Sequence, residues 1–206
     1  MLFIPGFMQR GDAWRPVAEL LPERYPSRML DHAEDTFRGR LAEIAQAGVG
    51  GVLVGSTAGI DEGPLRVARA EADEKLASWM EAMPIEDIVG LWERQPLFAD
   101  QPDALVDAQR PGRLSQDPRS LALLLRTAGQ GVLEPVWHEL RSLELPLLAI
   151  AGARDDGYSR AAKRIASTAP NGRAVLVEDV GHAPHLQRPD EVAGLVTEFL
   201  DAALRQ

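Results

Sequence analysis

An acidic residue and a histidine follow two apolar runs near the C-terminal end of this sequence. Asp155 comes after the run PLLAI at residues 146–150, and His182 comes after AVLVE at residues 174–178. Because the carboxyl ends of parallel strands meet at one edge of a sheet, we expect the two side chains to lie close together. A carboxylate that holds one nitrogen of an imidazole leaves the other nitrogen free to accept a proton. We therefore predict that Asp155 and His182 form the acid and base of a catalytic group.

The other ionisable residues of this kind are given no catalytic role. We expect Asp156 to face solvent and His185 to be a loop histidine that hydrogen-bonds to backbone groups, while His32 and His138 are expected to be structural or exposed. The sequence contains no cysteine, which excludes thiolate catalysis, disulfides and cysteine-ligated zinc. No metal site is predicted.

The elements that must position Asp155 and His182 alternate between apolar runs typical of buried strands and patterns typical of helices. Residues 61–140 differ, because they offer only helical patterns separated by proline and glycine. Strands that alternate with helices predict an α/β fold with a mostly parallel sheet, helices on both faces and a helical cap. The expected strands are 2–4, 27–30, 49–55, 146–150 and 174–178, and the expected helices are 12–21, 35–46, 74–83, 86–93, 117–128, 159–167 and one from Asp190.

Length and composition favour one structural domain plus this cap. Residues 1–60 and 141–206 would form the two parts of the α/β core, and residues 61–140 the cap. A net charge of −9, with no stripe of Lys and Arg, argues against nucleic acid as a partner. The apolar start MLFIPGF is too short for a leader or a membrane span, so we expect a cytoplasmic protein with no membrane partner. The sequence leaves the oligomeric state open.

A series of short motifs covers nearly the whole chain in a characteristic order. They are FIPGF, with Pro5 in place of a histidine, then STAGI, ARAEAD with Arg69 and Asp73, LWERQPLF with Trp92, AGARDDGY and GHAPH. In order and spacing they resemble the motifs of the α/β-hydrolases, most closely the synthases of 2-succinyl-6-hydroxy-2,4-cyclohexadiene-1-carboxylate (SHCHC) in menaquinone biosynthesis. The resemblance implies elimination of pyruvate from a succinyl-substituted cyclohexene acid, without a cofactor.

The same resemblance implies roles for residues outside the acid and base. Arginines and a tryptophan of the cap hold substrate carboxylates in that family, which points to Arg69, Trp92 and Arg110. The backbone N–H groups of Phe7 and Met8 would form the first half of an oxyanion hole. Each cap residue also has a structural interpretation: Arg69 can pair with an acid four residues later on a helix, and Trp92 can be a core residue of the cap.

The motif G-x-S-x-G, which carries the nucleophile of this fold between a strand and a helix, does not occur in the sequence. About one strand and helix, roughly 25 to 30 residues, are absent between residue 46 and the cap. We expect the sheet to close by about 4.8 Å where that strand is lost. GSTAG at residues 55–59 can be interpreted as an elbow with Thr57 as nucleophile. The favoured interpretation is the exit of a later strand, because residues 61–64 break a helix.

The sequence therefore predicts an enzyme of the SHCHC synthase type that is impaired because its nucleophilic serine is missing. One alternative is a carboxylesterase-like hydrolase of the same fold. Another is a non-catalytic protein that uses Arg69 and Trp92 to hold a dicarboxylate. In each case the partner is a small carboxylate or ester. An intact mass that differs from 22.5 kDa would show that the printed sequence omits a segment.

Overall fold

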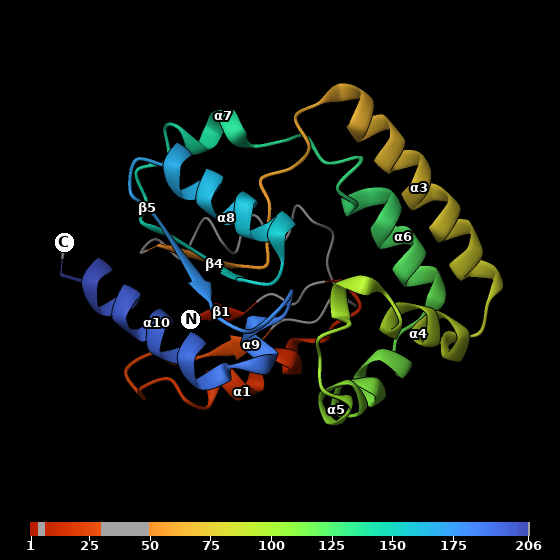
Figure 1. Cartoon of the computed structure of the whole chain (residues 1–206), viewed down its shortest axis with the longest axis horizontal. Helices are drawn as coiled ribbons and strands as arrows, with labels where there is room; N and C mark the ends of the chain where they lie inside the picture. Colours follow the sequence, from red (N-terminus) through yellow and green to blue (C-terminus); the bar gives the residue numbers. More distant parts are fainter. Residues whose placement is uncertain (4–6, 30–49, 206) are drawn as a thin grey trace.

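The structure of the protein is a computed structural model, which describes residues 1–3, 7–29 and 50–205. The predicted helix at 35–46 lies outside these described residues, as do Pro5 and His32. Figure 1 shows strands flanked by helices on two sides, with a separate group of helices beside them. This arrangement is the α/β class that the sequence predicts.

All five strands of the described chain pair in parallel. Their bounds are Leu2–Phe3 for β1, Arg28–Met29 for β2, Gly51–Val54 for β3, Leu147–Gly152 for β4 and Gly172–Val177 for β5. β1 pairs with β2, and β3, β4 and β5 form a second ladder in that order. In the second ladder Gly51 lies opposite Leu147, and Leu147 opposite Gly172.

The expectation that the sheet closes across the lost strand is wrong for the part of the chain that the structure describes. There, no ladder joins β1 to β3. The two ladders are instead held around one apolar core, in which Phe3 of β1 packs with Leu148 and Ile150 of β4 and with half-buried Val52 and Val54 of β3. This packing buries the apolar side chains of β1 and β3 and does not require backbone hydrogen bonds between these two strands.

Helices cover both faces of the second ladder (Figure 1). α1 (Arg15–Ala18), which follows the 3-10 helix η1 (Gly11–Trp14), and α10 (Pro189–Ala203) lie on one face. α8 (Asp156–Thr168) and α7 (Trp137–Leu140) lie on the other. β4 is buried along its whole length, and its residues alternate between the two cores. Leu148 and Ile150 face α1 and α10, whereas Leu147, Ala149 and Ala151 face α7 and α8.

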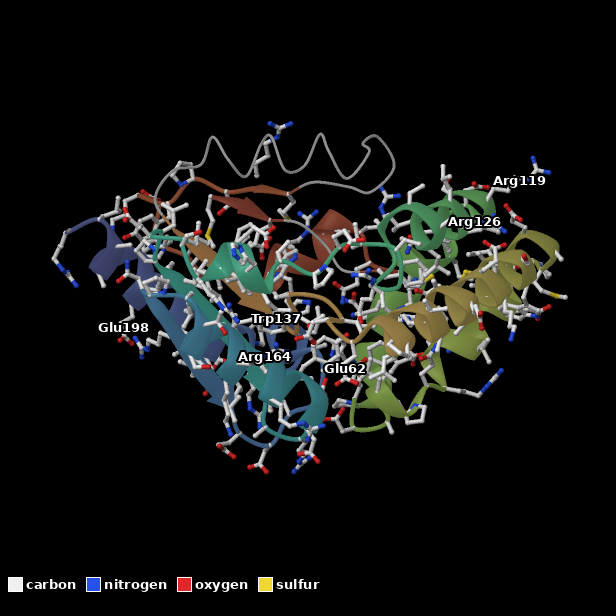
Figure 2. All side chains as sticks on the ribbon, turned by 90° about the horizontal axis from the view of Figure 1, so that it is seen from above. Glu62, Arg119, Arg126, Trp137, Arg164 and Glu198 are labelled. Carbon is white, nitrogen blue, oxygen red and sulfur yellow. The ribbon has the colours of Figure 1, made fainter. Side chains whose placement is uncertain are left out.

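The loop between β3 and the next helix is fixed by α7 and α8. The indole Nε1–H of Trp137 donates to the carbonyl of Gly59 at 2.9 Å. Arg164 lies over the Trp137 ring, with its guanidinium carbon 3.7 Å from the ring centroid, and also pairs with Asp61 (Figure 2). These contacts tie the exit of β3 to the core.

The helices between residues 63 and 128 form a segment of their own beside the sheet (Figure 1). Their bounds are Gly63–Ala82 for α3, Ile85–Glu93 for α4, Pro96–Phe98 for the 3-10 helix η2, Asp103–Leu114 for α5 and Pro118–Ala128 for α6. Their shared core includes Met80, Ile88, Leu121 and Leu125, together with Met8 from the N-terminal part. We call residues 63–128 the helical segment.

Two features of the helical segment differ from the sequence prediction. α3 begins at Gly63 rather than near residue 74. Pro64 is compatible with the first turn, because the backbone N–H that proline lacks would have no acceptor within the helix there. α5 was not predicted, and it contains Pro111 inside the helix. No helix within the described ranges has the length and apolarity that crossing a membrane requires. The domain limits at 60 and 140 and the cytoplasmic location remain predictions.

Candidate active site

Asp155 and His182 are in direct contact at the carboxyl ends of β4 and β5. His182 Nδ1 lies 2.8 Å from Asp155 Oδ2. Since a carboxylate only accepts hydrogen bonds, Nδ1 carries the proton and Nε2 is left as the basic nitrogen. The other oxygen, Oδ1, accepts the backbone N–H of Tyr158 at 3.1 Å and so caps α8. The carboxylate is thereby fixed by two different bonds.

Two glycines allow the strand exits that carry this pair to approach each other. A Cβ on Gly152 would lie 2.0 Å from the carbonyl oxygen of Gly181, and a Cβ on Gly181 would lie 2.5 Å from Asp100 Oδ1. The N–H of Gly181 donates to Gln187 Oε1 at 3.2 Å, and Gln187 Nε2 donates to Asp100 Oδ2 at 3.3 Å. The loop before His182 is therefore held from both the core and the helical segment.

The exit of β3 lies beside His182. Gly55 has φ of 55°, and a Cβ there would lie 2.8 Å from the carbonyl oxygen of His182 and 3.4 Å from its Cε1. The hydroxyl of Ser56 donates to the carbonyl of Val54 at 3.1 Å, and Thr57 Oγ1 accepts the N–H of Gly59 at 3.3 Å. Among the described residues, His182 has a hydrogen bond to Asp155 and none to a hydroxyl. Neither Ser56 nor Thr57 is placed as a nucleophile.

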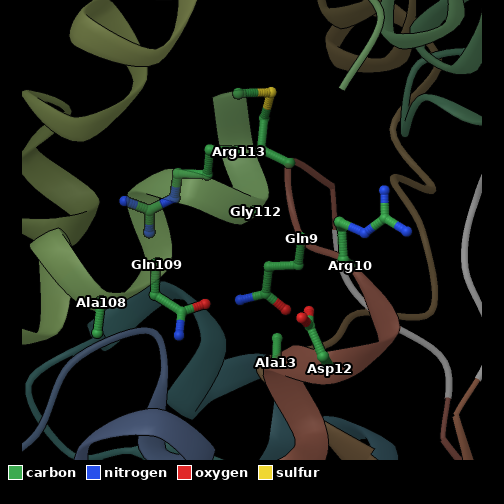
Figure 3. A pocket seen from close by; sticks show the side chains of 9 residues that line it. Gln9, Arg10, Asp12, Ala13, Ala108, Gln109, Gly112 and Arg113 are labelled. Carbon is green, nitrogen blue, oxygen red and sulfur yellow. The ribbon is translucent and has the colours of Figure 1, made fainter. Parts of the chain in front are cut away.

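A small cavity lies between the turn after β1 and α5 (Figure 3). Its volume is about 120 Å³. Met8 in its wall is fully buried and has φ of 60°, a conformation that costs free energy for a residue with a side chain. No hydrogen bond to the N–H of Phe7 or Met8 occurs in the described part of the chain. The cavity is lined by Met8, Gln9, Arg10, Asp12, Ala13, Ala108, Gln109, Gly112 and Arg113.

Arg113 is a charged residue of this cavity that the sequence did not reveal. It is 4% exposed, its Nη1 donates to Glu93 Oε1 at 3.0 Å, and its Nε has no hydrogen-bond partner among the residues that the structure describes. Arg110, which the sequence favoured, is half-exposed, pairs with the same Glu93 and lines a second cavity of about 310 Å³ with Phe98. Only the register of α5 distinguishes the two arginines, and that helix was not predicted.

Arg69 and Trp92 line neither cavity. Arg69 Nε pairs with Asp73 Oδ1 at 2.8 Å, which is the helix ion pair considered above, and its Nη1 donates to Gln130 Oε1 at 3.3 Å. The Trp92 ring packs against Phe7 and Phe98, with ring centroids 5.3 Å apart in both cases. Trp92 therefore connects the turn after β1 to the helical segment.

The expectation that His185 bonds to backbone groups is wrong. The backbone groups around it are engaged in the turn α9 (Pro184–Gln187), and the ring stacks on Trp14 with centroids 4.4 Å apart. Both ring nitrogens are buried, and neither has a hydrogen-bond partner within the described ranges. Desolvation, with a smaller effect of the nearby His182, lowers the pKa of His185 to about 3. His185 is therefore neutral near pH 7. Asp156 and His138 are exposed, as expected.

Comparison with known proteins agrees with this architecture. A putative SHCHC synthase of Bacillus subtilis (strain 168) is 30% identical over 152 residues, which are 72% of this chain and 56% of that protein. The solved structure of MenH from S. aureus matches with a TM-score of 0.91 at 23% identity, covering 98% of this chain and 93% of that one. The chain thus spans little more than half the length of the curated relative from B. subtilis.

A third relative has residues inside the aligned span that this chain does not match. The SHCHC synthase of Yersinia enterocolitica (serotype O:8, strain 8081) aligns over 242 residues at 24% identity, covering 97% of this chain and 86% of that protein. Since 97% of 206 residues is about 200, about 40 residues of the relative have no counterpart within the aligned span. The family model "Alpha/beta hydrolase family" matches residues 38–195. The chain therefore belongs to the alpha/beta hydrolase family.

Proposed function

We propose that this protein is an SHCHC-synthase-like α/β-hydrolase that binds a small carboxylate but lacks the nucleophile needed for efficient turnover. The observation that carries the proposal is the 2.8 Å contact between Asp155 and His182, together with the absence of a hydroxyl bonded to His182 among the described residues. A histidine base oriented by a carboxylate supplies two of the three members of a catalytic triad. In the described part of the chain no hydroxyl is hydrogen-bonded to His182 to serve as the activated oxygen.

Binding of a carboxylate is supported by Arg113. A guanidinium whose Nε is buried without a partner has an unused donor, and carboxylates are the anions that guanidinium geometry suits best. Met8 lines the same cavity. In this proposal the helical segment is the cap of the site, Trp92 holds its position over the turn after β1, and Arg69 and Arg110 act through their acidic partners rather than as direct ligands.

Non-catalytic carboxylate binding is the second candidate, and the same two observations favour it. An ester hydrolase of this fold would need the same nucleophile, so the missing hydroxyl counts against it equally. In the proposed elimination the base removes a ring proton, the freed electron pair forms a new C=C bond, and the C–O bond to the enolpyruvyl group breaks. The enolate that leaves takes up a proton and becomes pyruvate. In this proposal His182 acts through an oxygen hydrogen-bonded to its Nε2. We therefore expect binding without efficient turnover.

The proposal is tested by measuring binding and turnover on the same preparation. Succinate should raise the melting temperature, and Arg113→Leu should abolish the rise, whereas Arg119→Leu at the exposed far end of the helical segment should not (Figure 2). Release of pyruvate from the succinyl-cyclohexene substrate, and turnover of a p-nitrophenyl ester, should stay at background. Efficient pyruvate release that is lost in His182→Ala would show an intact enzyme and contradict the impairment. If the protein shows no binding of succinate and no turnover, the whole proposal is contradicted.

A further inference from the structure

The imidazole of His182 packs against two aromatic rings from different parts of the molecule. The ring of Tyr158, in the first turn of α8, is 4.4 Å away between centroids at an interplanar angle of 59°. The ring of Phe98, in η2 of the helical segment, is 5.9 Å away at 62°. Asp155 fixes only one nitrogen of the imidazole. Rotation about that single bond is therefore limited by these two rings.

Tyr158 is itself fixed at both ends. Its backbone N–H donates to Asp155 Oδ1 at 3.1 Å, and its hydroxyl accepts from Gln130 Nε2 at 3.0 Å. One carboxylate thus sets both the nitrogen that His182 presents and the backbone position of the ring that packs on it. The Gln130 bond sets the direction of that ring.

Gln130 is held where it can reach Tyr158. Its Oε1 accepts from Arg69 Nη1 at 3.3 Å. The glycines on either side of it allow the loop to approach its neighbours closely, since a Cβ on Gly129 would lie 2.3 Å from the carbonyl oxygen of Leu125, and one on Gly131 would lie 2.2 Å from the N of Ala70. A side chain at Gly131 would push the loop away from α3, and one at Gly129 would clash with the end of α6. The close packing of the loop therefore fixes the position of the Gln130 amide.

We infer that Tyr158 and Gln130 are positioning residues for His182: the Gln130 amide holds the Tyr158 ring, and the ring holds the imidazole against Asp155 with Nε2 facing the site. This inference rests on the proposed role of His182 as a base. It adds that the helical segment takes part in orienting that base, because Gln130 and its partner Arg69 belong to this segment or to the loop that follows it. No nucleophile is required for the effect.

The test follows the proton on His182 Nδ1, which gives a separate downfield NMR resonance when it is bonded to a carboxylate. His182→Asn assigns the resonance by its loss. Tyr158→Phe keeps the ring but removes the hydroxyl, and Gln130→Leu removes the amide. Either change should raise the exchange rate of this proton with water by about fivefold, the usual effect of one hydrogen bond on a local equilibrium. Tyr25→Phe is the matched control, because Tyr25 bonds to Asp201 on α10, away from His182.

The double variant separates positioning from general packing. If Gln130 acts through the Tyr158 hydroxyl, Gln130→Leu should add nothing in a Tyr158→Phe background. An unchanged exchange rate in both single variants would overturn the inference, as would an equal rise in Tyr25→Phe, which would indicate a general loosening. The measurement uses no substrate, so a failure of the proposed synthase chemistry leaves its outcome unaffected and is detected separately by the pyruvate assay.

Discussion

At the scale of single residues, Asp155 carries two functions that can be separated by substitution. One oxygen holds His182 and the other caps α8 through Tyr158. Asparagine caps a helix about as well as aspartate, but it offers the imidazole an amide in place of a carboxylate. The two functions therefore respond differently to Asn and Ala at this position.

We expect Asp155→Asn to keep most of the stability and to lose the His182 Nδ1–H resonance. Asp155→Ala should lose the resonance and also cost about 1 kcal/mol more in the free energy of unfolding, because the N-cap of α8 is lost as well. Urea unfolding of both variants measures the difference. Equal free energies of unfolding would mean that the cap contributes nothing, and a retained resonance in Asp155→Asn would mean that the amide oxygen of the new side chain, or another group, accepts the Nδ1–H.

His185 should make the protein sensitive to mild acid. The unfolded chain binds a proton on this residue below about pH 6.5, whereas burial lowers the pKa in the folded state to about 3. The unfolded state is therefore favoured as the pH falls from 6.5 towards 3, by about 2 to 3 kcal/mol at pH 4.5. His185→Phe, which keeps the stacking on Trp14, should remove this part of the decrease in the free energy of unfolding between pH 7 and pH 4.5.

The matched control for this prediction is His138→Phe, because His138 is exposed on α7. Urea unfolding at the two pH values should show the same acid loss in this control as in the unmodified protein. If His185→Phe loses as much stability in acid as the control does, the protonation of another group accounts for the effect.

The sequence was sufficient to predict the contact between Asp155 and His182, because both follow apolar runs whose strands can only be parallel neighbours. It was not sufficient for Arg113 or Gln130. Their positions depend on the register of α5 and on a loop whose glycines pack against α3. Such contacts join segments far apart in the chain, and no local pattern encodes them.

At the scale of elements, β3 is an edge strand within the described part of the molecule. Its four residues are all half-buried, whereas those of β4 are all buried. The N–H groups of Gly51 and Gly55 donate to the carbonyls of Pro146 and Ile150 in and before β4. In a parallel strand the intervening residues, Val52 and Val54, direct their N–H groups to the opposite side.

Amide hydrogen exchange should therefore alternate along β3. We expect slow exchange at Gly55, whose N–H is bonded to Ile150, and exchange at least tenfold faster at Val52 and Val54, which have no such partner in the described structure. NMR-detected exchange measures each amide. The amides of β4, between two strands, serve as the protected reference. Equal protection at Val54 and Gly55 would show that another strand pairs with this edge in solution.

The elements that were predicted correctly are those whose local sequence pattern is compatible with only one type of secondary structure. β4 and β5 are continuous apolar runs bounded by turn residues, and they form as expected. α5 was missed because a proline inside a helix normally ends it, and here Pro111 is tolerated on a face that is exposed. The start of α3 was missed because Gly63 and Pro64 are typical both of a break and of a first turn.

At the scale of the whole molecule, the two parallel ladders share a core but not a hydrogen-bonded edge among the described residues. About 40 residues of the Y. enterocolitica relative have no counterpart in this chain. A strand, a turn and a helix fit in that number. The favoured interpretation of GSTAG as a later strand exit agrees with the structure, since seven residues separate Gly55 from the start of α3.

These features lead to a prediction about the complete fold. A strand, a G-x-S-x-G elbow and a helix, inserted ahead of Gly51, should place a serine beside His182, which has no hydroxyl partner among the described residues. Because removing the serine of such a group costs up to about 10⁶-fold in other enzymes, even an imperfect insertion should raise pyruvate release by at least about 10³-fold over the unmodified chain. The pyruvate assay measures this, and the same insert with its elbow serine changed to alanine is the control. The control should protect the Val52 and Val54 amides equally well while remaining inactive, since it restores the strand without the nucleophile. If both inserts protect those amides and neither releases pyruvate, the pair Asp155 and His182 is not the base of this chemistry.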